Sequence, residues 1–292
     1  MTADTLRARL PRWVAHAGLG IRRPGGAPDA TTLNRALRLR VDRVELDVCA
    51  TADRRLVLRH DECVGEVPIA TLPLAELRWL ETRLLTLDEG MEHLGDLPLL
   101  LDVKTAATAP VLASWLRGRP DLSRFAVCSE SRAALLALRR AAPRVERWRS
   151  FPDLGLRRRE HVARVCGALL GHRRPGHAAF VARELVASAR DVFARRDEGI
   201  ARAGGVPWRR LLPLHLGNLS REVTATGICV HHWLLTPHLV EAAAALRLPV
   251  STWTVNDTPA LRRIARCGGI EMVTTDDVAA MRAAWAALPA GV

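Results

Sequence analysis

Apolar residues fall into two alternating patterns from residue 13 onward, short strand-like runs and longer stretches with helical spacing. This alternation predicts βα units joined into a parallel sheet. The strand-like runs cover residues 13–17, 43–48, 56–60, 97–104, 125–129, 147–151, 228–233, 250–255 and 270–274. They number one more than the eight strands of an α/β barrel. Because only residues 51–55 separate the third run from the second, we expect a hairpin extension there, which leaves a (β/α)8 TIM barrel.

Helix signals lie between these runs. Thr86 and Glu89 have the spacing of a capping box. Asp257 precedes a stretch with helical periodicity, and Thr236 followed by Pro237 opens another. These signals separate the strands as a barrel requires.

The region from residue 152 to residue 220 is the least regular part of the pattern. It is rich in Arg and Ala, favours helix, and is longer than one ordinary βα unit. We expect a strand near residues 179–181 and an inserted helix. The chain has no internal repeat and no low-complexity linker, so we expect one domain over residues 1–292.

Length and composition agree with one large core. The chain has 292 residues, of which 49% are hydrophobic. No apolar run approaches the roughly 20 residues that span a bilayer, and the start of the chain lacks a signal-peptide core. We therefore expect a cytoplasmic protein without a transmembrane segment. The six cysteines are scattered with no CxxC pair, which favours reduced thiols.

The formal net charge is +12, but the basic residues are spread along the chain and form no tract. This distribution, without interleaved aromatic residues, argues against a nucleic-acid partner. A basic field would attract an anionic substrate, although a solvated basic surface explains it equally well. Arginine carries nearly all of this charge, and Lys104 is the single lysine. Lys104 is therefore a candidate for a role that needs a compact ammonium group in place of a guanidinium; the alternative is that lysine occurs at this position by chance.

Acidic residues interrupt two of the strand-like runs. Residues two apart in a strand share a face, so Glu45 and Asp47 point the same way, as do Asp102 and Lys104. In a barrel these side chains would lie inside, at the carboxyl ends of the strands where active sites are built. Repulsion among three close carboxylates either raises their pKa values or requires a cation, and oxygen ligands favour Mg²⁺ or Ca²⁺. The alternative is that each acid caps a helix or pairs with an arginine.

Two histidines end strand-like runs in a similar way, His16 and His60. Paired imidazoles can serve as general base and general acid because they titrate near neutrality. The other eight histidines, including His231 and His232, have no comparable context, and we assign them no role.

A series of short motifs at predicted strand ends follows one order along nearly the whole chain. It comprises His16-Ala17-Gly18, Glu45-Leu46-Asp47, Thr51-Ala52-Asp53, His60-Asp61, Thr86-Leu87-Asp88-Glu89, Asp102-Val103-Lys104, Trp253-Thr254-Val255-Asn256 and Thr275-Asp276. Each motif alone is weak, but the ordered series resembles the glycerophosphodiester phosphodiesterase family.

This resemblance implies a TIM barrel of the phospholipase-C-like phosphodiesterase superfamily. It also implies hydrolysis of a glycerophosphodiester, or a related small diester, to an alcohol and a phosphomonoester. The implied site residues are Glu45, Asp47 and Asp102 for a divalent metal, His16 and His60 for acid–base chemistry, and Lys104 for phosphate. We expect Trp253 to form a wall for the substrate alcohol, or else to be an ordinary core aromatic.

The chain departs from the family pattern near its start. The family has Arg directly after the first histidine and a Glu-Asn-Thr triplet at the next helix, where this chain has Ala17 and Asp29-Ala30-Thr31. One anion contact is therefore missing. Arg22 and Arg23, in the same loop, are the candidates to replace it, with a surface role as the alternative.

Two further departures leave the substrate open. Asp102 stands where many members have Glu, as in the related spider-venom phospholipase D enzymes, and the segment after His60 forms only a short lid. The short lid favours an open pocket. The alternatives to hydrolysis are head-group cleavage of a lysophospholipid or sphingolipid at a membrane surface with formation of a cyclic phosphate, and a barrel that binds phosphate ligands without cutting them.

Overall fold

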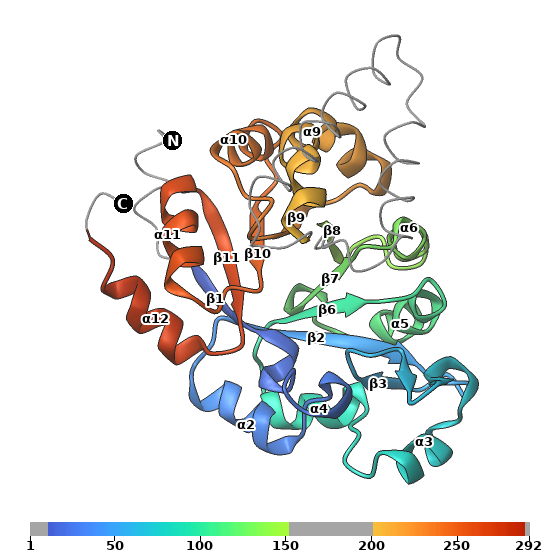
Figure 1. The fold of residues 1–292 in the computed structure, drawn as a ribbon. Coiled ribbons are helices and arrows are strands. Elements are labelled where there is room, and N and C mark those ends of the chain that lie inside the picture. Colours follow the sequence, from blue (N-terminus) through green and yellow to red (C-terminus); the bar gives the residue numbers. More distant parts are fainter. Residues whose placement is uncertain (1–10, 152–200, 290–292) are drawn as a thin grey trace.

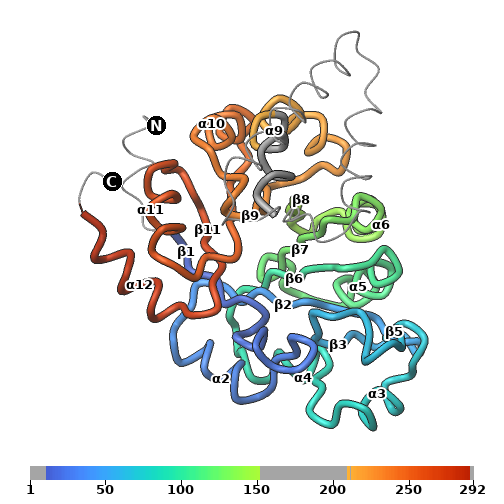
Figure 2. Tube along the Cα trace, in the orientation of Figure 1, coloured from blue at the N-terminus to red at the C-terminus, as the bar shows by residue number. Residues whose placement is uncertain are grey.

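The computed structural model describes residues 11–151 and 201–289 (Figures 1 and 2). Eight parallel strands close into a barrel, each hydrogen-bonded to the next and the last to the first. In barrel order they are β1 (Arg12–Ala15), β2 (Arg43–Ala50), β6 (Leu99–Val103), β7 (Phe125–Ser129), β8 (Glu146–Phe151), β9 (Gly227–His231), β10 (Val250–Trp253) and β11 (Ile270–Thr275). The predicted (β/α)8 barrel is confirmed.

Helices follow the strands and surround the barrel, as Figure 1 shows. They are α2 (Ala30–Arg38), α4 (Leu87–Leu94), α5 (Thr108–Arg117), α6 (Arg132–Ala141), α9 (Ala201–Val223), α10 (Pro237–Ala245), α11 (Thr258–Cys267) and α12 (Val278–Ala286). The capping box of Thr86 and Glu89 is confirmed, and so are Thr236 and Asp257, whose side chains accept the first free N–H groups of α10 and α11. Among the described helices, none is both long and apolar enough to cross a membrane.

The core has separate layers outside and inside the barrel. The larger cluster joins the outer faces of the strands to the helices. A smaller cluster contains residues of barrel strands alone, and it therefore fills the interior: Val14, Leu100, Ala126, Cys128, Trp148, Cys229 and Met272, with Trp253 packed against it. Strand β2 adds no apolar residue to this cluster. Its inward positions include Arg43, Glu45 and Asp47, so β2 contributes charged side chains to the interior in place of apolar ones.

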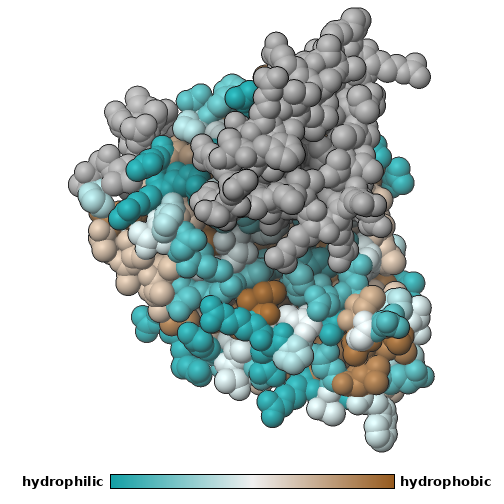
Figure 3. Space-filling model, viewed as in Figure 1, coloured by the Kyte–Doolittle hydropathy of each residue, from teal (hydrophilic) through white to brown (hydrophobic). Residues whose placement is uncertain are grey.

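An insertion lies between β2 and α4. Strand β3 (Leu56–Leu58) pairs antiparallel with β2, which confirms the predicted hairpin. The short lid follows as β4 (Cys63–Val64), β5 (Val67–Pro68), the 3-10 turn η3 (Ile69–Thr71) and α3 (Leu74–Leu80). Figure 3 shows apolar side chains gathered at the lower right, where Figure 1 places α3. Val67, Trp79 and Leu80 of this insertion are exposed.

Several strands end earlier than their apolar runs predict. Strand β1 stops at Ala15, and the turn His16–Leu19 follows, in which Ala17 and Gly18 have positive φ angles of 45° and 55° that end the extended backbone. Strand β6 likewise stops at Val103. His16 and Lys104 are therefore placed just beyond their strands, where loop backbone can direct them across the barrel mouth.

The strand expected near residues 179–181 lies outside the described residues. Strands β8 and β9 pair directly with each other, so the barrel closes between them without a further strand. Helix α9 precedes β9, in line with the helical composition of this region.

Candidate functional site

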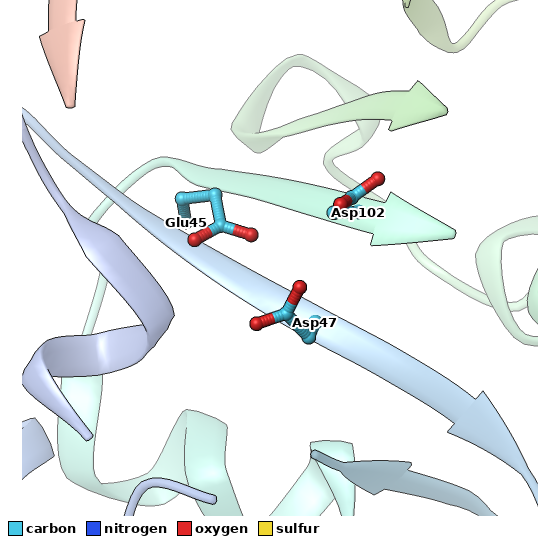
Figure 4. Close-up of side chains that lie close together, drawn as sticks. All are labelled: Glu45, Asp47 and Asp102. Atoms are coloured by element: carbon cyan, nitrogen blue, oxygen red, sulfur yellow. The ribbon is translucent and has the colours of Figure 1, made fainter. Parts of the chain in front are cut away.

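Three carboxylates meet inside the barrel near the carboxyl ends of β2 and β6. Asp47 and Asp102 are opposite one another in the strand register, and Glu45 lies two residues before Asp47 on the same face. Each residue offers one oxygen, and these oxygens all lie within 4.8 Å of one another. Figure 4 shows the three side chains converging from the two strands. The inward orientation expected from strand periodicity is therefore observed.

Lys104 supplies the positive charge nearest to this group. Its Nζ lies 2.6 Å from Asp47 Oδ1 and 2.6 Å from Asp102 Oδ2. Burial lowers the pKa of Lys104, but the charges of the surrounding carboxylates outweigh burial and hold that pKa well above its usual value. The only lysine of the chain is thus a permanently charged group in contact with two of the three acids.

One lysine does not compensate three buried acids. Burial, followed by repulsion from Asp47, raises the pKa of Glu45 to about 8. Burial also raises the pKa of Asp47, but the charges of Lys104 and of the two site histidines reverse the shift and lower it. In this arrangement Glu45 holds a proton at neutral pH where a cation would let it ionise.

The donor set fits a hard divalent cation. All three groups are carboxylates, the ligand type that Mg²⁺ and Ca²⁺ prefer. Oxygens around one such ion at about 2.1–2.5 Å are at most roughly 5 Å apart, which agrees with the observed 4.8 Å limit. Asp47 Oδ2 is buried and has no hydrogen-bond donor among the described residues. An oxygen in that position needs a positive partner, because an unsatisfied buried acceptor is costly.

Cation binding should therefore release a proton from Glu45. A carboxyl group has to ionise before it can bind an ion, and at pH 7 this group is below its pKa of about 8. We expect release of about one proton per ion at pH 7, with apparent affinity rising with pH until about pH 8. Titration calorimetry in buffers of different ionisation enthalpy measures the release. The Glu45→Gln variant should release none, and binding to the unmodified protein without proton release at pH 7 would contradict the shift.

His16 is oriented by residues on the neighbouring strand ends. Its Nδ1 lies 2.6 Å from Asp276 Oδ1, and Asn256 Nδ2 donates to Asp276 Oδ2 at 2.7 Å. Burial lowers the pKa of His16, but the Asp276 hydrogen bond and the charges of Glu45 and Asp47 outweigh it and raise that pKa. With Nδ1 held by Asp276, Nε2 is the ring nitrogen left to face a reacting group.

The same turn is tied to the carboxylates. The backbone N–H of Ala17 donates to Glu45 Oε2 at 2.7 Å. Ala17, which has a positive φ, is therefore the residue through which the turn contacts Glu45. Sequence reasoning assigned no role to Asp276 or Asn256, although both belong to the motif series. The available signal was their position directly after two strands.

His60 is positioned by its backbone. Its N–H and that of Asp61 both donate to the carbonyl of Gly25 at 3.1 Å. The preceding Arg59 is buried, and its guanidinium donates to Glu81 Oε2 at 2.9 Å and to the carbonyl of Asp61 at 2.9 Å. The His60 side chain is 43% exposed, in contrast to 17% for His16. The first loop and the lid thus hold His60 at the solvent side of the site.

Gly26 makes this arrangement sensitive to one methyl group. A Cβ at Gly26 would lie 2.5 Å from the Cβ of His60, at a φ of +64°. We expect Gly26→Ala to displace His60 and lower kcat for a diester by at least about tenfold. Gly65→Ala is the matched control, because Gly65 has a similar φ of +59° and no atom within 4 Å of an added Cβ. Steady-state kinetics of the two variants should differ, and equal losses would show that backbone strain alone matters.

Arg22, Arg23 and Trp253 are the remaining residues that the sequence predicts to contact the substrate. Arg23 is engaged by Asp29, the residue that caps α2, with 2.9 Å between NH1 and Oδ2. Burial raises the pKa of Asp276, but His16, the Asn256 hydrogen bond and, as a smaller effect, the charge of the exposed Arg22 outweigh it and lower that pKa. The charge of Arg22 therefore acts on the residue that orients His16. Trp253 ends β10 and packs on the interior cluster, a contact that both expected roles, a substrate wall and a core aromatic, predict.

Comparison with known proteins shows similarity at the level of structure. No protein-family model matches the chain, and no curated protein matches its sequence. Solved structures do match over most of the chain. A phosphodiesterase from Oleispira antarctica, in complex with the product sn-glycerol-3-phosphate, has 18% identity and a TM-score of 0.62, covering 97% of this chain and 99% of that one.

Two other solved structures give the same result. A putative glycerophosphoryl diester phosphodiesterase from Agrobacterium tumefaciens has 15% identity and a TM-score of 0.66, covering 95% of this chain and 98% of that one. A glycerophosphodiester phosphodiesterase from Thermotoga maritima has 16% identity and a TM-score of 0.62, with 94% and 98% covered. At these identities the similarity establishes the shared barrel fold.

Proposed function

We propose that this protein is a metal-dependent phosphodiesterase that hydrolyses a glycerophosphodiester or a related small diester to an alcohol and a phosphomonoester. The observation that carries the proposal is the convergence of Glu45, Asp47 and Asp102 beside Lys104 and an oriented His16. The similarity of the whole barrel to glycerophosphodiester phosphodiesterases supports it. That similarity, which covers 97% of the chain in one case, also supports a single domain over residues 1–292.

The residues divide the work of phosphodiester cleavage. Glu45, Asp47 and Asp102 would hold the divalent ion, which supplies positive charge for the phosphoryl oxygens when it is bound. Lys104 adds an ammonium at the same place and stabilises negative charge that develops at phosphorus. His16 and His60 act as general base and general acid. One takes a proton from the attacking hydroxyl or water, and the other protonates the leaving alcohol.

The test is turnover of defined diesters with and without a chelator. We expect the protein to release sn-glycerol 3-phosphate and the free alcohol from glycerophosphodiesters, to lose this activity with EDTA, and to regain it with added Mg²⁺ or Ca²⁺. Separate titrations with the two ions identify the preferred metal. Absence of metal-dependent turnover across a panel of glycerophosphodiesters and lysophospholipids would sink the proposal.

Two features support cyclising cleavage of a lysophospholipid as the second candidate. Asp102 replaces the Glu of many family members, and the lid consists of a short hairpin and the single helix α3. The exposed Val67, Trp79 and Leu80 on this lid are side chains suited to a lipid surface. Phosphorus NMR of the products separates the candidates, because cyclisation gives a cyclic phosphate and hydrolysis gives a phosphomonoester.

We also propose that the protein works in the cytoplasm. All five cysteines among the described residues are free thiols, and Cys49, Cys128 and Cys229 are buried as small apolar side chains. Burial raises the pKa of Cys49 to about 12, so this thiol stays protonated and unreactive. Such thiols are typical of a reducing compartment. Fractionation of cells that express the tagged full chain tests the location.

A further inference from the structure

Arg59 is a buried cation that belongs neither to the carboxylate group nor to the site histidines. It directly follows β3 and directly precedes His60. Its side chain is 7% exposed, in contrast to 43% for His60. Burial of a guanidinium is costly unless acceptors satisfy its N–H groups. The acceptors of Arg59 therefore identify the segments that this residue holds together.

The guanidinium of Arg59 joins the two ends of the lid. Its Nε donates to Glu81 Oε2 at 2.9 Å, and its NH1 donates to the carbonyls of Asp61, at 2.9 Å, and Cys63. Glu81 directly follows α3, at the far end of the lid, whereas Asp61 and Cys63 lie at its start. Several acceptors in different directions suit the planar, five-donor fork of arginine. One side chain thus closes the lid at its base.

The same residue contacts the first loop and the strand that carries the carboxylates. An added Cβ at Gly25 would lie 2.2 Å from Cζ of Arg59, so the guanidinium packs directly on the Gly25 backbone. The Gly25 carbonyl in turn accepts the N–H groups of His60 and Asp61 at 3.1 Å. The backbone N–H of Arg59 donates to the carbonyl of Asp47 at 3.1 Å. The lid, the first loop and β2 therefore meet at Arg59.

The position of the His60 ring depends on this junction. Its Nδ1 lies 3.0 Å from Oδ1 of the adjacent Asp61, whose side chain is 58% exposed. A contact between adjacent residues moves with the turn that carries both, so it does not fix the ring relative to the carboxylates. His16, by contrast, is held by Asp276 from another strand end. The place of the turn backbone, to which Arg59 donates, therefore determines where the His60 ring lies.

We propose that Arg59 is a positioning residue that fixes His60 relative to Asp47 and couples that position to the lid. The inference rests on the proposed function, since His60 is one of its two acid–base groups. Separation of the lid from its base would take Glu81 away from the guanidinium and release the turn that carries His60. Neither the strand pattern nor the ordered motifs assign a role to Arg59.

The first measurement is hydrogen exchange at the backbone amides of the metal-free full chain. Arg59→Lys keeps a positive charge but lacks the planar fork that reaches several acceptors together. We expect the amides of His60 and Asp61 to exchange at least about tenfold faster in this variant. Arg78→Lys is the matched control, because Arg78 on α3 also forms a lid ion pair, but with Glu89 of α4. It should leave the exchange of both amides unchanged.

The second measurement is steady-state turnover of a glycerophosphodiester in saturating Mg²⁺. Arg59→Lys should lower kcat by at least about tenfold and leave KM and the Mg²⁺ affinity unchanged, because misplacement of an acid–base group affects the chemical step. In a His60→Ala background the same substitution should cause no further loss of kcat, since Arg59 acts through His60. Arg78→Lys should keep full activity.

Any of three results would overturn the inference: unchanged exchange at His60 and Asp61 in Arg59→Lys, faster exchange with a normal kcat, or a further loss of kcat in the His60→Ala background. If Arg59→Lys does not fold, Glu81→Gln takes its place, because it keeps the guanidinium and weakens only the contact at the far end of the lid. It should speed exchange at the same two amides, and normal exchange there would contradict the coupling. Absence of diester turnover in the unmodified protein would instead refute the proposed function, and hydrogen exchange would still decide whether Arg59 holds this turn.

Discussion

The His16→Ala variant should lower kcat for a glycerophosphodiester by about a thousandfold, within the range for removal of a general acid–base group. The imidazole is partly buried, held at Nδ1 by Asp276, and lies where its charge acts on both Glu45 and Asp47. Steady-state kinetics at saturating metal measure the loss, and the metal affinity should stay close to that of the unmodified protein.

Two further variants test whether this loss of kcat reflects proton transfer by His16. Asp276→Asn keeps the imidazole but removes the charged acceptor that orients it, so its kcat should fall less than that of His16→Ala. His238→Ala should keep full activity, because this residue is exposed on α10. A His16→Ala variant within threefold of the normal kcat would exclude His16 from proton transfer.

The Asp47→Asn variant should weaken divalent-metal binding by more than about 100-fold, beyond the usual effect of changing an outer-shell partner of a metal ligand. Asp47 is central to the group, since it repels Glu45 and contacts Lys104. Lys104 contacts Oδ1 of Asp47, and Oδ2 has no hydrogen-bond donor among the described residues. Calorimetric titration with Mg²⁺ and with Ca²⁺ measures the affinity, and diester turnover should fall in parallel.

The fold of this variant should survive. Asparagine has nearly the same volume, and loss of the Asp47 charge removes the repulsion that raises the pKa of Glu45. Circular dichroism of the metal-free protein should match that of the unmodified protein. Asp96→Asn, a substitution of an exposed acid in the loop after α4, is the matched control and should bind metal normally. Unchanged metal affinity in Asp47→Asn would place the ion elsewhere.

Local sequence patterns sufficed for much of the barrel. The strand periodicity that put Glu45 and Asp47 on one face also determined which face is buried, because Val44, Leu46 and Val48 pack against helices. The hairpin after β2 followed from the few polar residues between two apolar runs. These features depend on residues close in sequence, where period and spacing determine the geometry.

The contacts that orient the site depend on distant residues. His16 and Asp276 are 260 positions apart and meet because closure of the barrel sets β1 beside β11. His231 reaches Trp253 through the register of β9 and β10. Local patterns also did not show where each strand stops, because apolar residues such as Val255 continue beyond the end of β10 at Trp253. Such relations require the closed sheet, which no local pattern specifies.

The Arg22 and Arg23 pair shows the same limit within one loop. Both arginines were equal candidates to replace the missing arginine at Ala17. The structure separates them, since Arg23 pairs with the residue that caps α2 while the charge of Arg22 acts on Asp276. The ion-pair partner of each arginine side chain depends on the conformation of the loop that carries it. In this loop Gly25 and Gly26 have positive φ angles.

The most direct test of the account is anomalous diffraction from crystals of the full chain grown with Mn²⁺, a substitute for Mg²⁺ and Ca²⁺ at oxygen sites. We expect one strong peak in the barrel mouth, within about 2.0–2.6 Å of carboxylate oxygens from Glu45, Asp47 and Asp102. Crystals that show no peak there, with Lys104 still bridging Asp47 and Asp102 in saturating Mn²⁺, would contradict the metal site and the chemistry built on it.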